Sequence, residues 1–204
     1  MSKSVLISIQ PYYVFLIIAK TMGWDIPQEK TIEVRKTVPK DKDWNKKVII
    51  YFSKNKKSFA KIPKEYQSLM KQYLGKVIGE FVCDKIDEIR VVDTELMRYV
   101  TVNDKADMFI SEETCLSVDA LYDYLWPKKG YGFHISGLVI YDEPKELREF
   151  YTDSCINFRT GVCVSPTNEC VYLFHNLQGD IQPCVTKLIR PPQSWSYVES
   201  LTNN

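Results

Sequence analysis

Lys30, Glu33 and Arg35 are the residues of this sequence whose types and spacing best suit chemistry. They lie in the segment 30–36, KTIEVRK, where apolar Ile32 and Val34 alternate with polar residues. This alternation predicts a strand with an apolar face toward the core and a polar face opposite, whose side chains are roughly 6–7 Å apart. A hydroxyl, a carboxylate and a guanidinium would then stand in a row, with Lys30 at the strand entrance. The simplest alternative is an ordinary solvated strand face with an ion pair.

The charge of the chain is unevenly distributed, although the net charge is only +1. Residues 30–76 hold 14 Lys and Arg against 4 Asp and Glu, whereas residues 77–154 hold 8 against 17. A basic half of this kind suits a phosphate-binding face, or it complements the acidic half within the molecule.

Length and composition indicate a globular protein with a substantial core, because 45% of the 204 residues are hydrophobic. The N-terminus has no signal-peptide pattern, and the apolar run 12–19 is too short to cross a bilayer. We therefore expect a cytoplasmic protein without membrane association, whose six Cys are thiols or metal ligands. The sequence contains no P-loop or GxGxxG pattern, which argues against dinucleotide chemistry.

Apolar patterning predicts an α+β fold in one domain over residues 1–204, built as a small β-barrel of five to six strands with flanking helices. Strands are expected at 5–9, 30–36, 48–52, 76–83 and 132–141, with 86–92 as an extension of the fourth. Helices are expected at 11–20, 64–73, 118–125 and 145–151. Residues 93–129 are expected to form an acidic, mostly helical insertion, and 152–186 a loop-rich insertion containing Cys.

Four blocks, taken in order, resemble the ASCH domain, a branch of the PUA-like superfamily. They are the opening Leu6-Ile7-Ser8-Ile9 with Pro11 and Tyr12, the segment 30–36, the segment Gly75-Lys76-Val77-Ile78-Gly79-Glu80-Phe81, and a late strand followed by Tyr141-Asp142-Glu143-Pro144. The stretch 190–199, RPPQSWSYVE, is similar to the closing segment of ASCH-like proteins from bacteria and their phages.

The resemblance implies a PUA-like barrel with a cleft beside the first helix that suits RNA or a nucleotide. Positive side chains there can meet phosphate, and Glu33 can accept from a base amino group or hold Arg35 in place. Aromatic rings are candidates for base stacking, with core packing as the alternative. The nucleic-acid-binding residues expected on this basis are Lys30, Thr31, Glu33, Arg35, Lys36, Tyr12, Arg190 and Trp195, with Tyr13 as a further aromatic candidate.

Two departures from the family pattern bear on the mechanism. The loop before Lys30 is longer than usual, with Gly23 seven residues upstream. Some small ASCH-like proteins are amidohydrolases of acetylated cytidine that use a Lys and a Thr, but Glu33 occupies that Thr position here. A Lys base needs a lowered pKa, which a nearby carboxylate opposes. Binding is therefore expected over catalysis, with Lys30, Thr31 and Glu33 as the reacting set if the chain is an amidohydrolase or ribonuclease.

Four of the Cys fall within thirty residues and could hold a structural zinc ion: Cys155, Cys163, Cys170 and Cys184. His175 is a substitute ligand. Because the spacing contains no Cys-x-x-Cys pair, free thiols are the alternative. No other cofactor is expected.

The sequence thus predicts an RNA-binding or single-stranded nucleic-acid-binding protein, with the Lys-rich region 40–64 supplying electrostatic attraction. One alternative is a hydrolase of a modified nucleoside or of RNA. Another is an adaptor that binds a protein partner through the acidic region 93–129.

Overall fold

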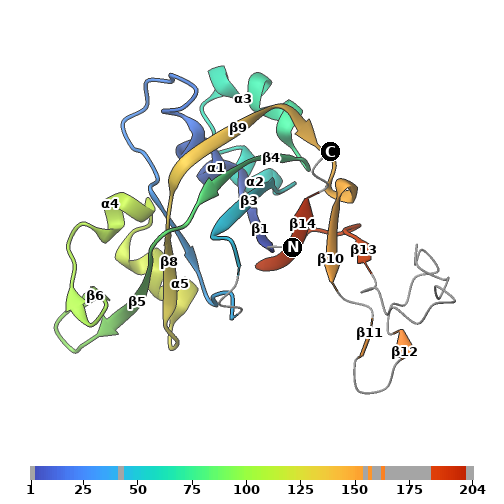
Figure 1. Ribbon diagram of the computed structural model, residues 1–204. Coiled ribbons are helices and arrows are strands. Elements are labelled where there is room, and N and C mark those ends of the chain that lie inside the picture. Colours follow the sequence, from blue (N-terminus) through green and yellow to red (C-terminus); the bar gives the residue numbers. More distant parts are fainter. Residues whose placement is uncertain (1–2, 41–43, 154–155, 158–161, 164–184, 201–204) are drawn as a thin grey trace, which may run out of the picture.

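Two β-sheets dominate the computed structural model, which describes residues 3–40, 44–153, 156–157, 162–163 and 185–200 (Figure 1). The larger sheet has seven strands in the order β13-β10-β14-β1-β3-β4-β9. β1 and β3 are parallel, and the other neighbours in this sheet are antiparallel. The strands are β1 (Ser4–Ile9), β3 (Lys47–Phe52), β4 (Val77–Val82), β9 (Ser136–Lys145), β10 (Phe150–Asp153), β13 (Val185–Lys187) and β14 (Trp195–Ser200).

The smaller sheet is antiparallel and has the order β2-β8-β5-β6-β7. Its strands are β2 (Ile32–Arg35), β8 (Gly130–His134), β5 (Ile86–Asp93), β6 (Arg98–Val102) and β7 (Lys105–Ala106); β11 (Ile156–Asn157) and β12 (Val162–Cys163) form a separate pair. The chain passes between the two large sheets four times: from β1 through α1 to β2, from β2 to β3, from β4 to β5 through residues 83–85, and from β8 to β9 through Ile135. Figure 1 shows β8 continuing upward into the arch of β9.

Short helices cover the sheets: α1 (Pro11–Ile18), α2 (Lys56–Phe59), α3 (Lys64–Met70), α4 (Ile110–Thr114) and α5 (Val118–Leu125), with 3₁₀ turns η1 (Lys71–Tyr73) and η2 (Leu147–Glu149). The starts of α1, α2 and α5 follow ordinary capping chemistry. Pro11 occupies the first turn of α1, where no amide hydrogen is needed. The side chains of Asn55 and Ser117 accept hydrogen bonds from the Ser58 and Ala120 amides at the starts of α2 and α5.

Three hydrophobic cores follow from this layering. The largest lies between one face of the seven-stranded sheet and α1, and it includes Val5, Ile50 and Phe15 together with Phe133 of β8. The second lies between the five-stranded sheet and α4 and α5, and it contains Ile32, Val34, Ile89, Ile110, Leu121 and Leu125. The third covers the other face of the seven-stranded sheet, around Leu6, Ile49 and Phe150. Strand β2 is therefore buried on both of its faces.

The expected α+β class is confirmed, and the predicted strands at 5–9, 48–52 and 76–83 and the helix at 64–73 are present. The strands run in two sheets, and no closed barrel is formed by the residues that the structure describes. Region 86–92 forms β5 of the five-stranded sheet and is not an extension of the strand at 76–83, as was expected. In the same described part of the chain, no helix has the length and apolar character needed to span a membrane.

Two expectations about the second half are wrong. Region 93–129 is not mostly helical, because the alternating, β-branched stretch 98–102 forms β6 and pairs with β5 before α4 and α5 follow. Region 145–151 holds the end of β9, the short turn η2 and the start of β10 in place of a helix. Pro144 is tolerated inside β9 because β9 lies at the edge of its sheet, where an amide hydrogen is not needed on the outer side.

Candidate functional site

Lys30, Glu33 and Arg35 meet in a buried ion-pair cluster, hereafter the charged cluster. Their exposed fractions are 2%, 6% and 5%. Glu33 lies between the two cations: its Oε2 is 3.4 Å from Lys30 Nζ and its Oε1 is 3.0 Å from Arg35 Nη2. The expectation of an open polar strand face is therefore wrong. Contacts from α1, β1 and the segment before β14 cover that face, so that β2 has no solvated side.

Lys30 is fixed by contacts with two helices, α1 and α4. Its backbone amide donates to the Leu16 carbonyl, and its Nζ donates to the Thr114 carbonyl at 2.6 Å. The ammonium also lies 5.2 Å from the centre of the Tyr13 ring. Burial lowers the pKa of Lys30 below its ordinary value, and this effect outweighs the opposing attraction of Glu33. The sequence argument, in which the carboxylate kept this pKa high, left out the larger effect of burial.

Arg35 bridges the two sheets but leaves part of its donor capacity unused. Its Nη2 donates to the Ser8 carbonyl at 2.8 Å, and its Nη1 donates to the Ser194 carbonyl at 3.3 Å. Arg35 Nε and the Ser194 hydroxyl are both buried without a hydrogen-bond partner in the structure. Unpaired buried donors are costly, at about 1–3 kcal/mol each. The two groups belong to residues already in contact, through Arg35 Nη1 and the Ser194 carbonyl.

The charged cluster carries more positive than negative charge when Lys30 is protonated. Two cations then share one carboxylate in a buried position. An uncompensated buried charge is expensive, and a protein relieves it by binding a counter-charge or by shifting a pKa. Either an anionic ligand group or a neutral Lys30 amine would balance this site, and the two solutions correspond to binding and to base catalysis.

Aromatic rings surround the charged cluster. Tyr13 is half-buried, and burial followed by the charge of Glu33 raises the pKa of its phenol. Its ring centre lies 5.9 Å from that of Tyr12. Burial also raises the pKa of Tyr124, which is close enough to be affected by Arg35 and Glu33. Trp195 is half-buried and donates from its indole Nε1 to the Thr37 hydroxyl at 2.9 Å. Rings of this kind combine apolar area with polar tips that suit a nucleobase.

Exposed lysines gather on the segment next to the start of α1. The Tyr12 amide donates to the Ser58 hydroxyl of α2 at 3.1 Å, which joins α2 to the aromatic pair Tyr12–Tyr13. The segment 53–75 contains a single acidic residue, Glu65. Six of its lysines are exposed and have no ion pair with any described residue: Lys54, Lys56, Lys57, Lys61, Lys64 and Lys71. We refer to these six residues as the lysine surface.

The remaining sequence candidates lie at different distances from this centre. Thr31 precedes β2 and is held by its backbone, which donates to the Glu113 carbonyl and accepts from the Ile135 amide. Lys36 is exposed, with its Nζ 4.8 Å from the centre of the Tyr124 ring. Arg190 is exposed, and no contact between described residues joins it to the charged cluster. Of the residues predicted as zinc ligands, Cys163 ends β12, whereas Cys155, Cys170, Cys184 and His175 lie outside the described residues. The zinc prediction therefore stays a prediction. Among the described residues no group of three His, Cys, Asp or Glu could hold a metal ion.

Sequence reasoning missed the residues that contact the charged cluster through their backbones. Ser8 and Thr114 contribute only carbonyl oxygens, which any residue type supplies, so no sequence signal marks them. Ser194 lies inside the closing segment 190–199 that resembles the ASCH family, and that resemblance was the one available signal. Tyr124 was not singled out because it lies far from β2 along the chain.

Known proteins similar to this chain were found among solved structures. No protein-family model matches the chain, and no curated protein matches it in sequence. Two crystal structures of ZmASCH from Zymomonas mobilis are similar in fold. A Tyr-to-Phe variant has a TM-score of 0.39 and 17% identity, covering 71% of this chain and 76% of that chain. A Ser-to-Ala variant has a TM-score of 0.45 and 15% identity, covering 97% of this chain and 89% of that chain. Both are ASCH proteins by name.

Proposed function

We propose that this protein binds single-stranded RNA, with the charged cluster receiving one nucleotide and the lysine surface attracting the phosphate backbone. The observation that carries the proposal is the pair of buried, unpartnered donors, Arg35 Nε and the Ser194 hydroxyl, within a cluster of surplus positive charge. A phosphate or carbonyl oxygen placed there would satisfy both donors and, if anionic, balance the charge.

The order of contacts along the molecule supports a strand of nucleotides over a free mononucleotide. Ser58 of α2 contacts Tyr12, Tyr12 lies beside Tyr13, and Tyr13 lies over Lys30. From Lys30 the contacts continue through Glu33 to Arg35. The lysine surface therefore adjoins one end of a series of aromatic and charged groups. Because Lys30 and Arg35 are buried, the exposed lysines are the groups suited to backbone phosphates, and this revises the roles expected from the sequence.

The test measures anisotropy of a labelled twelve-nucleotide RNA at several salt concentrations. Ser194→Ala removes one donor without changing charge, so we expect binding to weaken about threefold to tenfold at every salt concentration, with the salt slope unchanged. The double variant Lys56→Gln/Lys57→Gln removes two cations, so the slope of log K against log salt should become shallower by about 0.7 for each phosphate that is no longer neutralised.

A matched control keeps the number of removed charges constant. Lys105→Gln/Lys128→Gln removes two exposed lysines from the acidic half of the chain, and neither lysine has an ion pair with a described residue. We expect the control to retain the native slope. The proposal is wrong if the native chain does not bind RNA, or if the control loses as much binding as the variant in α2.

A second candidate function is hydrolysis of an acetylated cytidine, and the lowered pKa of Lys30 favours it. A neutral Lys30 amine could take a proton from water as the water attacks the acetyl carbon. The Lys30 ammonium would then give that proton to the N4 nitrogen as the C–N bond breaks, so that cytidine leaves as the free amine and acetic acid leaves and ionises to acetate. Nζ donates its hydrogen bond to a carbonyl oxygen, and no hydroxyl contact of Lys30 is present among the described residues. Like any amine, Lys30 can accept a proton only when it is deprotonated, and burial favours that form.

The hydrolase candidate predicts a specific pH profile. Product release, followed by chromatography, should rise with pH and level off below the ordinary lysine pKa of 10.5. Lys30→Gln should abolish release, whereas Lys36→Gln, which changes an exposed neighbour, should not. Absence of acetate from the native reaction would eliminate this candidate and leave RNA binding untouched.

A further inference from the structure

A short segment closes the charged cluster on one side. Residues 189–194 lie between β13 and β14 and form neither helix nor strand. The Ser194 carbonyl accepts hydrogen bonds from Arg35 Nη1 at 3.3 Å and from the Ser8 amide at 3.4 Å. We refer to residues 189–194 as the strap. Through Ser194 the strap reaches both Arg35 and β1, so that it is part of the cover that keeps Arg35 buried.

The strap is anchored just beyond its two ends. Before it, the Leu188 amide donates to the Phe150 carbonyl at 2.9 Å, and the Leu188 side chain packs against the third core. After it, Trp195 pairs with Ile7 in the sheet, and the Trp195 indole Nε1 donates to the Thr37 hydroxyl at 2.9 Å. Because Thr37 lies just after β2, this side-chain bond ties the end of the strap to the strand that carries the charged cluster.

Between these anchors the strap is weakly held. In the part of the chain that the structure describes, residues 189–193 make no hydrogen bond and no ion pair. Pro191 and Pro192 have no amide hydrogen with which to make one. The two bonds to the Ser194 carbonyl are longer than the usual range of about 2.7–3.2 Å. Few polar contacts therefore have to break for the strap to leave its place.

The other neighbours of the charged cluster are parts of hydrophobic cores. α1 and β1 contribute Phe15 and Val5 to the largest core, and α4 contributes Ile110 to the second. No strap residue belongs to any of the three cores that the described residues form. Because displacing α1, β1 or α4 would open a core, the strap is the part of the cover that moves at the lowest cost.

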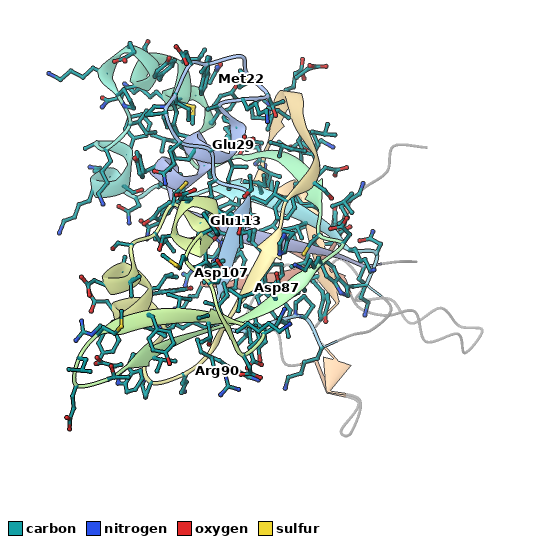
Figure 2. All side chains as sticks on the ribbon, turned by 90° about the vertical axis from the view of Figure 1, so that its left-hand side faces the viewer. Met22, Glu29, Asp87, Arg90, Asp107 and Glu113 are labelled. Atoms are coloured by element: carbon teal, nitrogen blue, oxygen red, sulfur yellow. The ribbon has the colours of Figure 1, made fainter. Side chains whose placement is uncertain are left out.

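Charge also distinguishes the two sides of the cluster. Residues 107–113, which lead into α4, include three acidic residues and no basic one, and Figure 2 looks onto this side, where Asp107 and Glu113 are labelled. Residues 188–194 include Arg190 and no acidic residue. A phosphate is repelled on the α4 side and is therefore expected to approach from the side of the strap.

Opening of the strap would serve the donors that are buried without a partner. Arg35 Nε and the Ser194 hydroxyl are such donors while the strap is closed. Because a buried unpaired donor is costly, water or a phosphate oxygen that reaches these groups offsets part of the cost of opening. The bond from Arg35 Nη1 to the Ser194 carbonyl breaks in the same movement. The open form thus presents free donors at both Nε and Nη1 of Arg35.

We infer that the strap is a gate. Residues 189–194 move away from Arg35 between the anchors at Leu188 and Trp195, and this opening admits a nucleotide phosphate to the charged cluster. The bond from the Trp195 indole to Thr37 is the latch that favours the closed form. The choice of ligand rests on the proposed RNA binding, whereas the opening is a property of the free chain and is measured without RNA.

The test follows amide hydrogen exchange of the free full chain, residue by residue, by nuclear magnetic resonance. The Ser8 amide bonds to the strap, whereas Leu6, two residues earlier in β1, is paired with Ser196 inside β14. After correction for intrinsic rates, we expect the Ser8 amide to exchange about tenfold faster than the Leu6 amide or more, because the strap opens without β14. Thr37→Val removes the latch, so the Ser8 rate should rise by about threefold to tenfold while the Leu6 rate stays the same.

Association of the labelled twelve-nucleotide RNA is measured in parallel. Thr37→Val should speed this association by the same factor as it speeds Ser8 exchange, because both rates depend on the population of the open form. The matched control is Thr101→Val in β6, which removes a hydroxyl that has no hydrogen-bond partner among the described residues. The control should change neither rate.

The inference is overturned if the Ser8 and Leu6 amides exchange equally slowly, or if Thr37→Val leaves the Ser8 rate unchanged. It is also overturned if Thr37→Val speeds Ser8 exchange but not the association of RNA that the native chain binds, because the nucleotide then enters elsewhere. A native chain that shows the expected exchange but binds no RNA would refute RNA binding and leave the opening of the strap in place.

Discussion

At the scale of single residues, burial changes what a charged side chain can do. The sequence pattern alone suggests that Lys30 is a solvated cation at an open strand face. In the folded chain Lys30 is 2% exposed, and burial lowers its pKa. Arg35 is held by two backbone carbonyls and still has Nε without a partner. The same residue types that suggest phosphate contacts in the sequence thus form a buried ion-pair cluster in the folded chain.

Asp87 provides a prediction at this scale. Its buried carboxylate accepts hydrogen bonds from Lys85 at 2.7 Å and Asn103 at 2.7 Å, and its Oδ2 lies 2.6 Å from His134 Nε2. Burial alone would raise its pKa, but these partners together lower it below the ordinary 3.8. A lowered folded pKa stabilises the fold fully above 3.8, and this contribution is lost as the pH falls through the folded value.

We therefore expect Asp87→Asn to lower the free energy of unfolding by about 1–3 kcal/mol at pH 7, because three donors lose a charged acceptor. The difference from the native chain should shrink as the pH falls below 3.8. Urea unfolding at several pH values measures it. Asp84→Asn, at an exposed neighbouring position, should change little at any pH; an equal loss in both variants would contradict the role given to the Asp87 contacts.

At the scale of elements, the residues of a segment were enough to predict where several helices begin. The Pro11 start of α1 and the Ser117 start of α5 follow directly from the sequence, because capping depends on neighbouring residues alone. The end of β9 did not follow, because Pro144 is a usual helix starter. Its tolerance within β9 depends on the place of that strand at the sheet edge, which is a property of the sheet and not of the segment.

Ser117 provides the prediction at this scale. Its side chain accepts from the Ala120 amide at 3.2 Å, and α5 covers the second core through Leu121 and Leu125. Ser117→Ala should lower the free energy of unfolding by about 1 kcal/mol, and Ser117→Gly by only a few tenths. Ser68→Ala, an exposed site within α3, should be neutral or slightly stabilising because alanine favours helices. Thermal unfolding of the three variants distinguishes these outcomes, and an equal loss for alanine and glycine would contradict the capping role.

At the scale of the whole molecule, the uneven charge seen in the sequence separates into different surfaces. The lysine surface lies on α2, α3 and the residues that flank them, beside the start of α1, whereas acidic residues such as Glu88, Asp93 and Glu112 belong to the five-stranded sheet and α4 (Figure 1). The phosphate backbone proposed as a partner is expected at the lysine surface, because that surface attracts it.

The sequence by itself determined the α+β class, the strand at residues 32–35, the helix starts and the separation of charge, because each depends on side-chain periodicity or on neighbouring residues. The tertiary structure alone decided that both faces of β2 are buried, since the second face is covered by α1, β1 and the segment before β14, which are distant along the chain. It also decided the partners of Lys30 and Arg35, because backbone carbonyls such as those of Ser8 and Thr114 leave no trace in residue type. Burial of a charge is a property of everything packed around it, and that is why the chemistry of this site could not be read from its own strand.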